Sequence, residues 1–122
     1  MKENNTKQET EAASYAETLA TQFRKGFLVY CVLVICEHEP QYSSAIIARL
    51  HAADMVVVEG TIYPLLSRLQ KDGLFDYEWR ESESGPPRKY YALSTFGKDV
   101  AAHLKEQIKS LNVTLKQLEK GA

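Results

Sequence analysis

The sequence predicts a mainly α-helical domain with one small β-hairpin, an α+β fold. The length of 122 residues is that of a single domain, large enough to bury a core without disulfides. Apolar residues recur at helical spacing up to residue 73 and again after residue 94, whereas they alternate with polar residues in between. A composition of 44% hydrophobic and 25% charged residues excludes collagen-like, wholly disordered and disulfide-scaffold chains.

The N-terminal third predicts a polar tail followed by one long helix. Residues 1–13 contain no periodic apolar side chain, and we expect a disordered tail there. A stripe of apolar residues then follows at steps of four or three: Tyr15, Leu19, Phe23, Phe27, Tyr30 and Val34. Between Phe27 and Cys36 all sides are apolar, which predicts a buried helix, although the β-branched residues there also permit a strand. Pro40 marks the end of this element.

Two shorter helices are expected in the middle of the chain. Ser43 or Ser44 can cap the first helix, which fades before an extended apolar segment over residues 55–58. The second begins between residues 59 and 61, so that Pro64 falls in its first turn, where the missing N–H is harmless. Its buried stripe consists of Ile62, Leu65, Leu66 and Leu69.

After Gly73, which suits the position that ends a helix, the hydrophobic period changes to two. Aromatic residues at positions 75, 77 and 79 alternate with charged ones, which predicts a strand with one solvated face. A six-residue turn over residues 82–87 and a second strand over residues 88–93 complete a hairpin. Trp79 is expected to pack beneath this hairpin or, alternatively, to line a ligand cavity.

The last helix is expected to serve as a dimerisation helix. Ser94 or Thr95 can cap it. Its apolar residues are spaced 4, 3, 4 and 3, the seam that two packed helices need: Leu104, Ile108, Leu111, Leu115 and Leu118. We expect this seam, together with Leu19 and Phe23 of the first helix, to form the interface of a homodimer. The alternative is that the seam covers the core of its own chain.

Three helices followed by a two-stranded hairpin are the winged helix-turn-helix arrangement, although a three-helix bundle with an added hairpin would give the same pattern. We therefore expect a tail over residues 1–13, a winged helix-turn-helix domain over 14–94 and a dimerisation helix over 95–122. A dimer of this kind presents two reading helices to two half-sites of double-stranded DNA, so its target is palindromic.

The outward face of the third helix could contact DNA. With its leucine stripe inward, this helix turns Tyr63, Pro64 and Ser67 outward, and Arg68 and Lys71 lie close by. A recognition helix contacts base edges with residues near its N-terminus, while basic residues take phosphates. The alternative is an ordinary solvated helix face.

The hairpin tip provides a second potential DNA contact. The net charge is only −1, but residues 85–122 hold seven basic and three acidic side chains. Gly85 allows close backbone approach, two prolines stiffen the turn, and Arg88 and Lys89 follow at once. A stiff loop ending in cations suits the backbone along a minor groove, whereas the alternative is a surface turn with incidental charge.

Two motifs in this region resemble the PadR family of bacterial transcriptional regulators. The first is Glu59-Gly60-Thr61-Ile62-Tyr63-Pro64-Leu65-Leu66-x-Arg68-Leu69-x-Lys71-Asp72-Gly73-Leu74. The second is Trp79-x-Glu81-Ser82-Glu83-x-Gly85-Pro86-Pro87-Arg88-Lys89-Tyr90-Tyr91-x-Leu93-Ser94-x-x-Gly97. The resemblance covers about residues 15–118 and implies a winged-helix homodimer that represses transcription from an inverted-repeat operator. The polar start of the chain and the lack of a membrane-length apolar run predict that it is cytoplasmic.

By this resemblance the second motif forms the wing and the first the recognition helix. The residues expected to contact DNA are Ser43, Thr61, Tyr63, Pro64, Ser67, Arg68, Lys71, Gly85, Arg88 and Lys89. One branch of the family responds to phenolic acids or drugs, so the resemblance allows a small hydrophobic effector between the last and first helices. The sequence departs from the family at Val58, at Tyr42-Ser43-Ser44-Ala45, and at Ile108, where drug-binding members carry a tryptophan.

Other classes of function find little support in the sequence. His38, His51 and His103 lie on separate elements and have no nucleophile or carboxylate pair beside them, so no enzyme, cofactor or metal site is expected. Cys31 and Cys36 are expected to be buried reduced thiols, because their spacing does not suit zinc. The polar N-terminus is unlike a signal peptide, and no uninterrupted apolar run approaches the roughly 20 residues of a membrane span.

A protein-binding adaptor without DNA binding is the alternative function. Its support is the nearly neutral net charge and an acidic patch made of Asp76, Glu78, Glu81 and Glu83. Binding to the DNA upstream of its own gene would separate the two functions.

Overall fold

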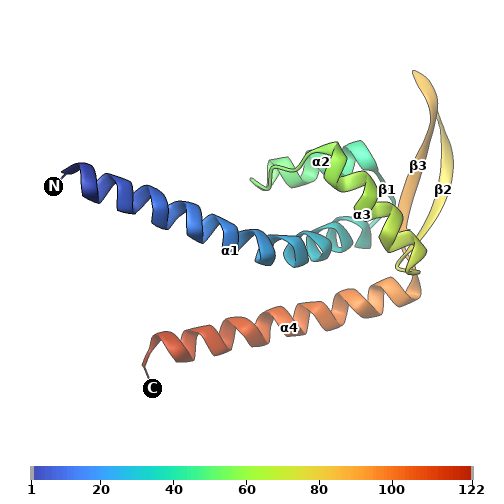
Figure 1. The fold of residues 1–122 in the computed structure, drawn as a ribbon. Helices are drawn as coiled ribbons and strands as arrows, with labels where there is room; N and C mark the ends of the chain where they lie inside the picture. Colours follow the sequence, from blue (N-terminus) through green and yellow to red (C-terminus); the bar gives the residue numbers. More distant parts are fainter. Residues whose placement is uncertain (1, 122) are drawn as a thin grey trace.

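A computed structural model describes residues 2–121 as helices around a small sheet. The elements are α1 (Lys2–Glu37), β1 (Gln41–Tyr42), α2 (Ser43–Ala52), α3 (Glu59–Lys71), β2 (Phe75–Ser82), β3 (Gly85–Leu93) and α4 (Thr95–Glu119). The antiparallel sheet has the order β1-β3-β2. Both ends of the chain project away from the hairpin, because α4 runs back along the direction of α1 (Figure 1). This is the winged helix-turn-helix fold that the sequence predicts.

The core forms where the second half of α1 meets α2, α3, the base of the sheet and the start of α4. Leu33, Ile46, Ile62 and Leu66 are fully buried there. The apolar stretch before Cys36 is helical, as expected. Within Asn5–Glu37, α1 is apolar and long enough to cross a membrane by length and composition, but its buried residues belong to this core.

The expectation of a disordered tail is wrong for the described part of residues 1–13. The helix α1 begins at Lys2, and residues 5–13 are helical and exposed, while Met1 lies outside the described residues. The segment lacks glycine and proline and is rich in glutamate, lysine, glutamine and alanine, which favour helix. The helix α1 therefore extends beyond the core toward the N-terminus, and residues 5–13 bury no face of it.

The two middle helices begin without the expected caps. Tyr42 is the N-cap of α2 and makes no side-chain capping bond, because β1 leads straight into the helix and leaves Ser43 in its first turn. The helix α3 begins at Glu59 after Val58, so Pro64 lies in its second turn rather than the first. Proline has no N–H, so the helical bond to the Gly60 carbonyl cannot form.

The end of α3 follows the prediction. Gly73 has φ +86°, a conformation that glycine adopts without steric cost. The Gly73 N–H donates to the Gln70 carbonyl at 3.0 Å, and the Leu74 N–H donates to the Leu69 carbonyl at 2.9 Å. These two bonds make a Schellman motif that ends the helix and turns the chain into β2.

The hairpin is longer and its tip shorter than the sequence suggests. The strands pair as far as Ser82 and Gly85, so only residues 83 and 84 connect them, in place of a six-residue turn. Pro86 and Pro87 lie inside β3. This is possible because β1 pairs only with Tyr90 and Tyr91, which leaves that edge of β3 unpaired near the tip.

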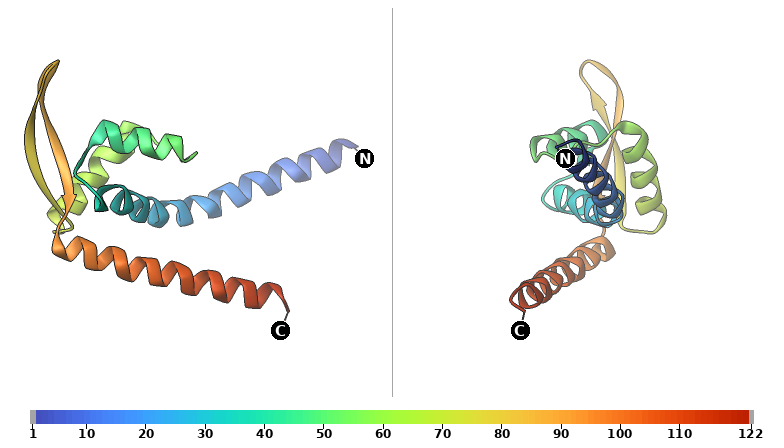
Figure 2. Two further views of the ribbon diagram at one scale, coloured as in Figure 1. Left: turned by 180° about the vertical axis from the view of Figure 1, so that it is seen from behind. Right: turned by 60° about the vertical axis from the view of Figure 1, so that its left-hand side comes forward.

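The prediction that the hairpin has one solvated face and covers Trp79 is also wrong. Phe75 is buried, but Tyr77 is exposed and Trp79 is 63% exposed. Both views in Figure 2 show the reason, because the hairpin projects beyond the helices and no second layer covers its outer half.

The start of α4 is fixed by Ser94, one of the two expected caps. Its hydroxyl oxygen accepts a hydrogen bond from the Gly97 N–H at 2.9 Å and donates to the Gly73 carbonyl at 2.7 Å. The same side chain therefore caps α4 and ties it to the turn that ends α3.

Candidate nucleic-acid interface

The helix α3 presents a polar outer face opposite its buried stripe. Ile62, Leu66 and Leu69 are buried, as predicted, and Leu65 is half-buried. The exposed residues of the helix include every predicted contact on it: Thr61, Tyr63, Pro64, Ser67, Arg68 and Lys71. Arg68 lies 4.0 Å from the Asp72 carboxylate, and both side chains are mostly exposed, so this ion pair holds the arginine only weakly.

Tyr63 joins α3 to the start of α2 and to the base of the hairpin. The Ser43 hydroxyl donates to the Tyr63 hydroxyl at 3.4 Å, so Ser43 lies beside the outer face of α3. Burial, and secondly the neighbouring Tyr63, raise the pKa of Tyr91 on β3. The exposed tyrosine of α3 is thus hydrogen-bonded to the start of α2.

The two expected cations of the hairpin lie on opposite faces of β3. Neighbouring strand residues point to opposite sides, so Arg88 and Lys89 separate. The Lys89 ammonium lies 4.3 Å from the centre of the Tyr77 ring, and the Arg88 guanidinium carbon lies 4.5 Å from that of Tyr42. Gly85, the remaining predicted wing contact, is exposed at the start of β3.

Sequence analysis missed the residues that hold these cations. Tyr42 and Tyr77 contact them, and Arg80 lies directly opposite Arg88 in the strand register. The alternation of β2 contains the signal for the faces. The pairing register of β2 with β3, however, depends on the length of the tip. The two prolines suggested a longer tip than the structure has.

A long apolar stripe on the helical arms remains uncovered in the single chain. Phe23 is 78% exposed, Leu111 and Leu118 are about as exposed, and Leu19 and Leu115 are exposed by about half. Leu104 packs against the core and Ile108 is half-buried. The chain's own core therefore accounts for the start of the predicted seam and leaves its outer part exposed.

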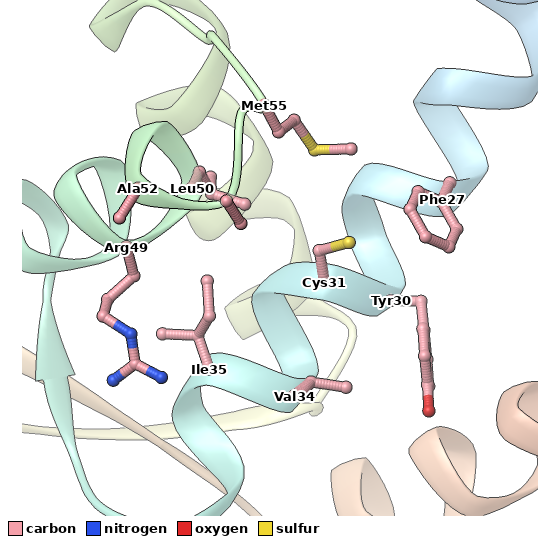
Figure 3. Close-up of a pocket in the computed structure, with 10 residues that line it drawn as sticks. Phe27, Tyr30, Cys31, Val34, Ile35, Arg49, Leu50, Ala52 and Met55 are labelled. Atoms are coloured by element: carbon pink, nitrogen blue, oxygen red, sulfur yellow. The ribbon is translucent and has the colours of Figure 1, made fainter.

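An apolar groove of about 570 Å³ lies between α1 and the end of α2 (Figure 3). In Figure 3, Cys31 and Ile35 on α1 face Leu50 and Met55, and Arg49 lies at one end. Burial raises the pKa of Cys31. Cys36 is buried as expected, and burial raises its pKa to about 12, whereas Cys31, which was also expected to be buried, is only half-buried because it lines this groove.

The histidines stay apart, as their positions on separate elements suggest. His51 Nε2 lies 3.0 Å from the Val57 carbonyl, and His38 and His103 are exposed. Within residues 2–121, no group of three or more histidine, cysteine or acidic side chains is arranged to hold a metal ion.

Comparison with known proteins decides the family. The profile of the Transcriptional regulator PadR-like family matches residues 32–103. The chain belongs to the PadR-like family. The matched residues contain α2, α3 and all three described strands, so membership and fold agree, and this PadR-like chain is a DNA-binding transcriptional regulator.

Solved structures resemble this PadR-like chain over most of their length. A PadR-like transcription factor from Bacteroides fragilis is 46% identical with a TM-score of 0.73, and the match covers 83% of this chain and 98% of that one. A PadR-like regulator from Bacillus cereus is 33% identical with a TM-score of 0.73, covering 83% and 99%. A PadR family regulator from Eggerthella lenta is 28% identical with a TM-score of 0.79, covering 89% and 96%. No curated protein matches the chain.

Proposed function

We propose that this PadR-like regulator is a cytoplasmic homodimer that represses transcription by binding an inverted-repeat operator. The observation that carries the proposal is the hydrogen bond that joins Ser43 at the start of α2 to Tyr63 on the exposed face of α3, next to which the hairpin projects beyond the helices (Figure 2). A duplex lying on this surface reaches the outer face of α3 and the cations of β3 together.

Each part of this surface has a role that suits its chemistry. Tyr63, Pro64 and Ser67 set register and contact base edges in the major groove, with Thr61 and Ser43 at the margin. The cations bind backbone phosphates: Arg68, Lys71, Arg88 and Lys89. Gly85 lets the backbone at the wing tip approach the duplex closely.

Dimerisation joins two such surfaces through α1 and α4. Its support is the exposed apolar stripe that includes Phe23 and Leu111, which a single chain leaves in water. Burial of this stripe between two copies stabilises the dimer and fixes the separation of the two recognition helices.

A small hydrophobic effector, such as a phenolic acid or a drug, binds between α4 and α1 and relieves repression. The exposed apolar residues on both helices, including Phe23 and Leu111, support this part of the proposal, because they offer apolar surface on α1 and on α4. The effector changes DNA affinity only if it binds more tightly to one arrangement of the two chains than to the other.

A mobility-shift assay with the DNA upstream of the gene tests the proposed function. At low salt, where electrostatic attraction is strongest, we expect a shifted complex that an unrelated duplex competes for less well. The absence of any shift under these conditions would contradict DNA binding and favour an adaptor that uses the exposed acidic residues of β2.

Replacing both Arg88 and Lys89 by alanine tests the wing. We expect weaker binding to every sequence and a salt slope flattened by about 1.8 per chain, because each lost phosphate contact removes about 0.9. Lys116→Ala with Lys120→Ala is the matched control, since it removes the same charge from the far end of α4. An unchanged slope in the wing variant would refute the phosphate contacts.

A further inference from the structure

Two arginines face each other across the hairpin with no structural reason to do so. The register pairs Arg80 of β2 directly with Arg88 of β3. Like charges directly opposite on antiparallel strands destabilise a sheet. Positions that break a local rule in this way are expected to be functional.

Aromatic rings hold both guanidinium groups in place. The Arg88 guanidinium carbon lies 4.5 Å from the centre of the Tyr42 ring, and that of Arg80 lies 4.4 Å from the centre of the Tyr90 ring. The two tyrosine rings pack edge to face with their centres 5.3 Å apart. The four side chains therefore form one connected cluster, and stacked guanidinium groups keep their N–H edges free to donate.

Only one of the two arginines has a carboxylate partner. The Arg80 Nε donates to Glu78 Oε1 at 2.7 Å, whereas Arg88 has no ion pair among the described residues. Arg88 therefore stacks on Tyr42 without a carboxylate to neutralise it. In the strand register only the Ser82–Gly85 pair lies between the arginine pair and the tip, and the hairpin as a whole projects beyond the helices (Figure 2).

We propose that Arg80 and Arg88 form a two-arginine clamp for a backbone phosphate of DNA. Tyr42 and Tyr90 are positioning residues, and Glu78 is an internal competitor that Arg80 leaves when the phosphate binds. The proposal rests on the proposed DNA-binding function and adds a contact from β2. Because Lys89 lies on the opposite face of β3, a wing in a groove offers cations to the phosphate strands on both sides.

Removing Arg80 tests the clamp through the salt dependence of binding to the DNA upstream of the gene. We expect Arg80→Ala to weaken binding roughly tenfold, the size of one charge-assisted hydrogen bond. The salt slope should fall by about 0.9 per chain. Arg80→Gln removes the charge but keeps the first carbons of the side chain, so it should give the same change in slope even if alanine loosens the hairpin. An unchanged slope in both variants would overturn the clamp.

Glu78→Gln tests the competition. Glu78→Gln should tighten DNA binding by more than Asp76→Asn does. Asp76 carries the same charge on the same face of β2, but it lies two residues further from the arginines. In the Arg80→Ala background, the two gains should become equal. A gain from Glu78→Gln that is the same with and without Arg80 would show that no competition exists.

Tyr42 separates positioning from folding. Tyr42→Phe keeps the ring beneath Arg88 and should retain wild-type affinity, whereas Tyr42→Leu should weaken binding while the urea midpoints of the two variants stay similar. An equal loss of DNA affinity in Tyr42→Phe and Tyr42→Leu would contradict the view that the ring positions Arg88. If the wild-type protein binds no DNA at low salt, the proposed function falls together with the clamp. If the wild-type protein binds and the Arg80 variants match it, the clamp alone falls.

Discussion

Gly97 occupies a position in the first turn of α4 where no side chain fits. A Cβ at Gly97 would overlap the carbonyl oxygen of Leu74, and the Gly97 N–H is bonded to the Ser94 hydroxyl. Because the contact is with backbone, the turn between α3 and β2 would have to move.

We therefore expect Gly97→Ala to lower the free energy of unfolding by about 3 kcal/mol. Gly26→Ala is the control, because a Cβ there meets open space inside helix α1, and it should stabilise the protein by about 0.5–1 kcal/mol. Urea unfolding at one fixed protein concentration measures both, since a dimer's stability depends on concentration. Equal effects of the two substitutions would contradict the steric argument.

The buried thiol of Cys36 predicts a loss of stability at high pH. Its pKa is raised from 9.0 to about 12, so the folded protein keeps a proton that the unfolded chain loses. Above about pH 9 the unfolded chain therefore binds fewer protons, and the free energy of unfolding falls as the pH rises toward 12. Below pH 9 both states hold the proton and this contribution is fully present.

Cys36→Ala should have a shallower fall between about pH 9 and pH 11 than the wild-type protein. Some fall should remain, because burial also raises the pKa values of Cys31 and Tyr91. Urea unfolding along a pH series measures the difference. Parallel curves for the two proteins would contradict the assignment.

At the scale of elements, α3 carries a proline in its second turn, on the outward face proposed to contact DNA. Pro64 lies inside the helix, where proline costs about 3 kcal/mol relative to alanine. A proline that lowers stability in this way is expected where its rigid ring contributes to function, here by contacting DNA from the exposed face of α3.

Pro64→Ala is expected to raise the free energy of unfolding by about 1–3 kcal/mol and to weaken binding to the upstream DNA. Urea unfolding and a mobility-shift titration of the same preparation measure both effects. Unchanged DNA affinity would remove Pro64 from the contact surface, and unchanged stability would contradict the cost of a proline inside the helix.

Local chemistry explains which elements the sequence predicts well. Gly73 and Ser94 make hydrogen bonds to residues close by in the sequence. The C-terminal end of α3 and the start of α4 are therefore predictable. The strand β1 has only two residues and exists because Tyr90 and Tyr91 pair with it, a contact that no local pattern contains. The prediction for Trp79 was wrong because the alternation of apolar and polar residues tells which face of the strand a side chain is on. It does not tell whether another layer covers that face.

The candidate site was predictable only in part for the same reason. The outward face of α3 follows from its helical period. Arg88 and Lys89 looked like one cationic pair because they are adjacent, but the register of the strand separates them. Arg80 was overlooked because its nearness to Arg88 depends on a two-residue connection that the sequence did not suggest.

For the whole molecule, the outer stripe of α4 should decide assembly. Leu111 and Leu115 are exposed in the single chain, so Leu111→Glu with Leu115→Glu should leave each chain folded. Loss of their burial should raise the dimer dissociation constant at least about a hundredfold. Sedimentation equilibrium and circular dichroism measure mass and folding, with Lys116→Glu as a control on the same helix. A variant that stays dimeric would show that the seam is not the interface.

Joining two chains through the arms also sets the spacing of the target. Two recognition helices read half-sites separated by about 34 Å, one turn of the duplex, or a multiple of it. A shift of α4 against α1 would change this spacing, which is how an effector at that interface could alter DNA affinity.

The mass of the complex with the upstream duplex, measured by sedimentation equilibrium, tests whether two chains act as one reader. We predict two chains per duplex at every protein concentration that gives a complex. One chain per duplex, or no complex at low salt, would contradict the dimeric regulator.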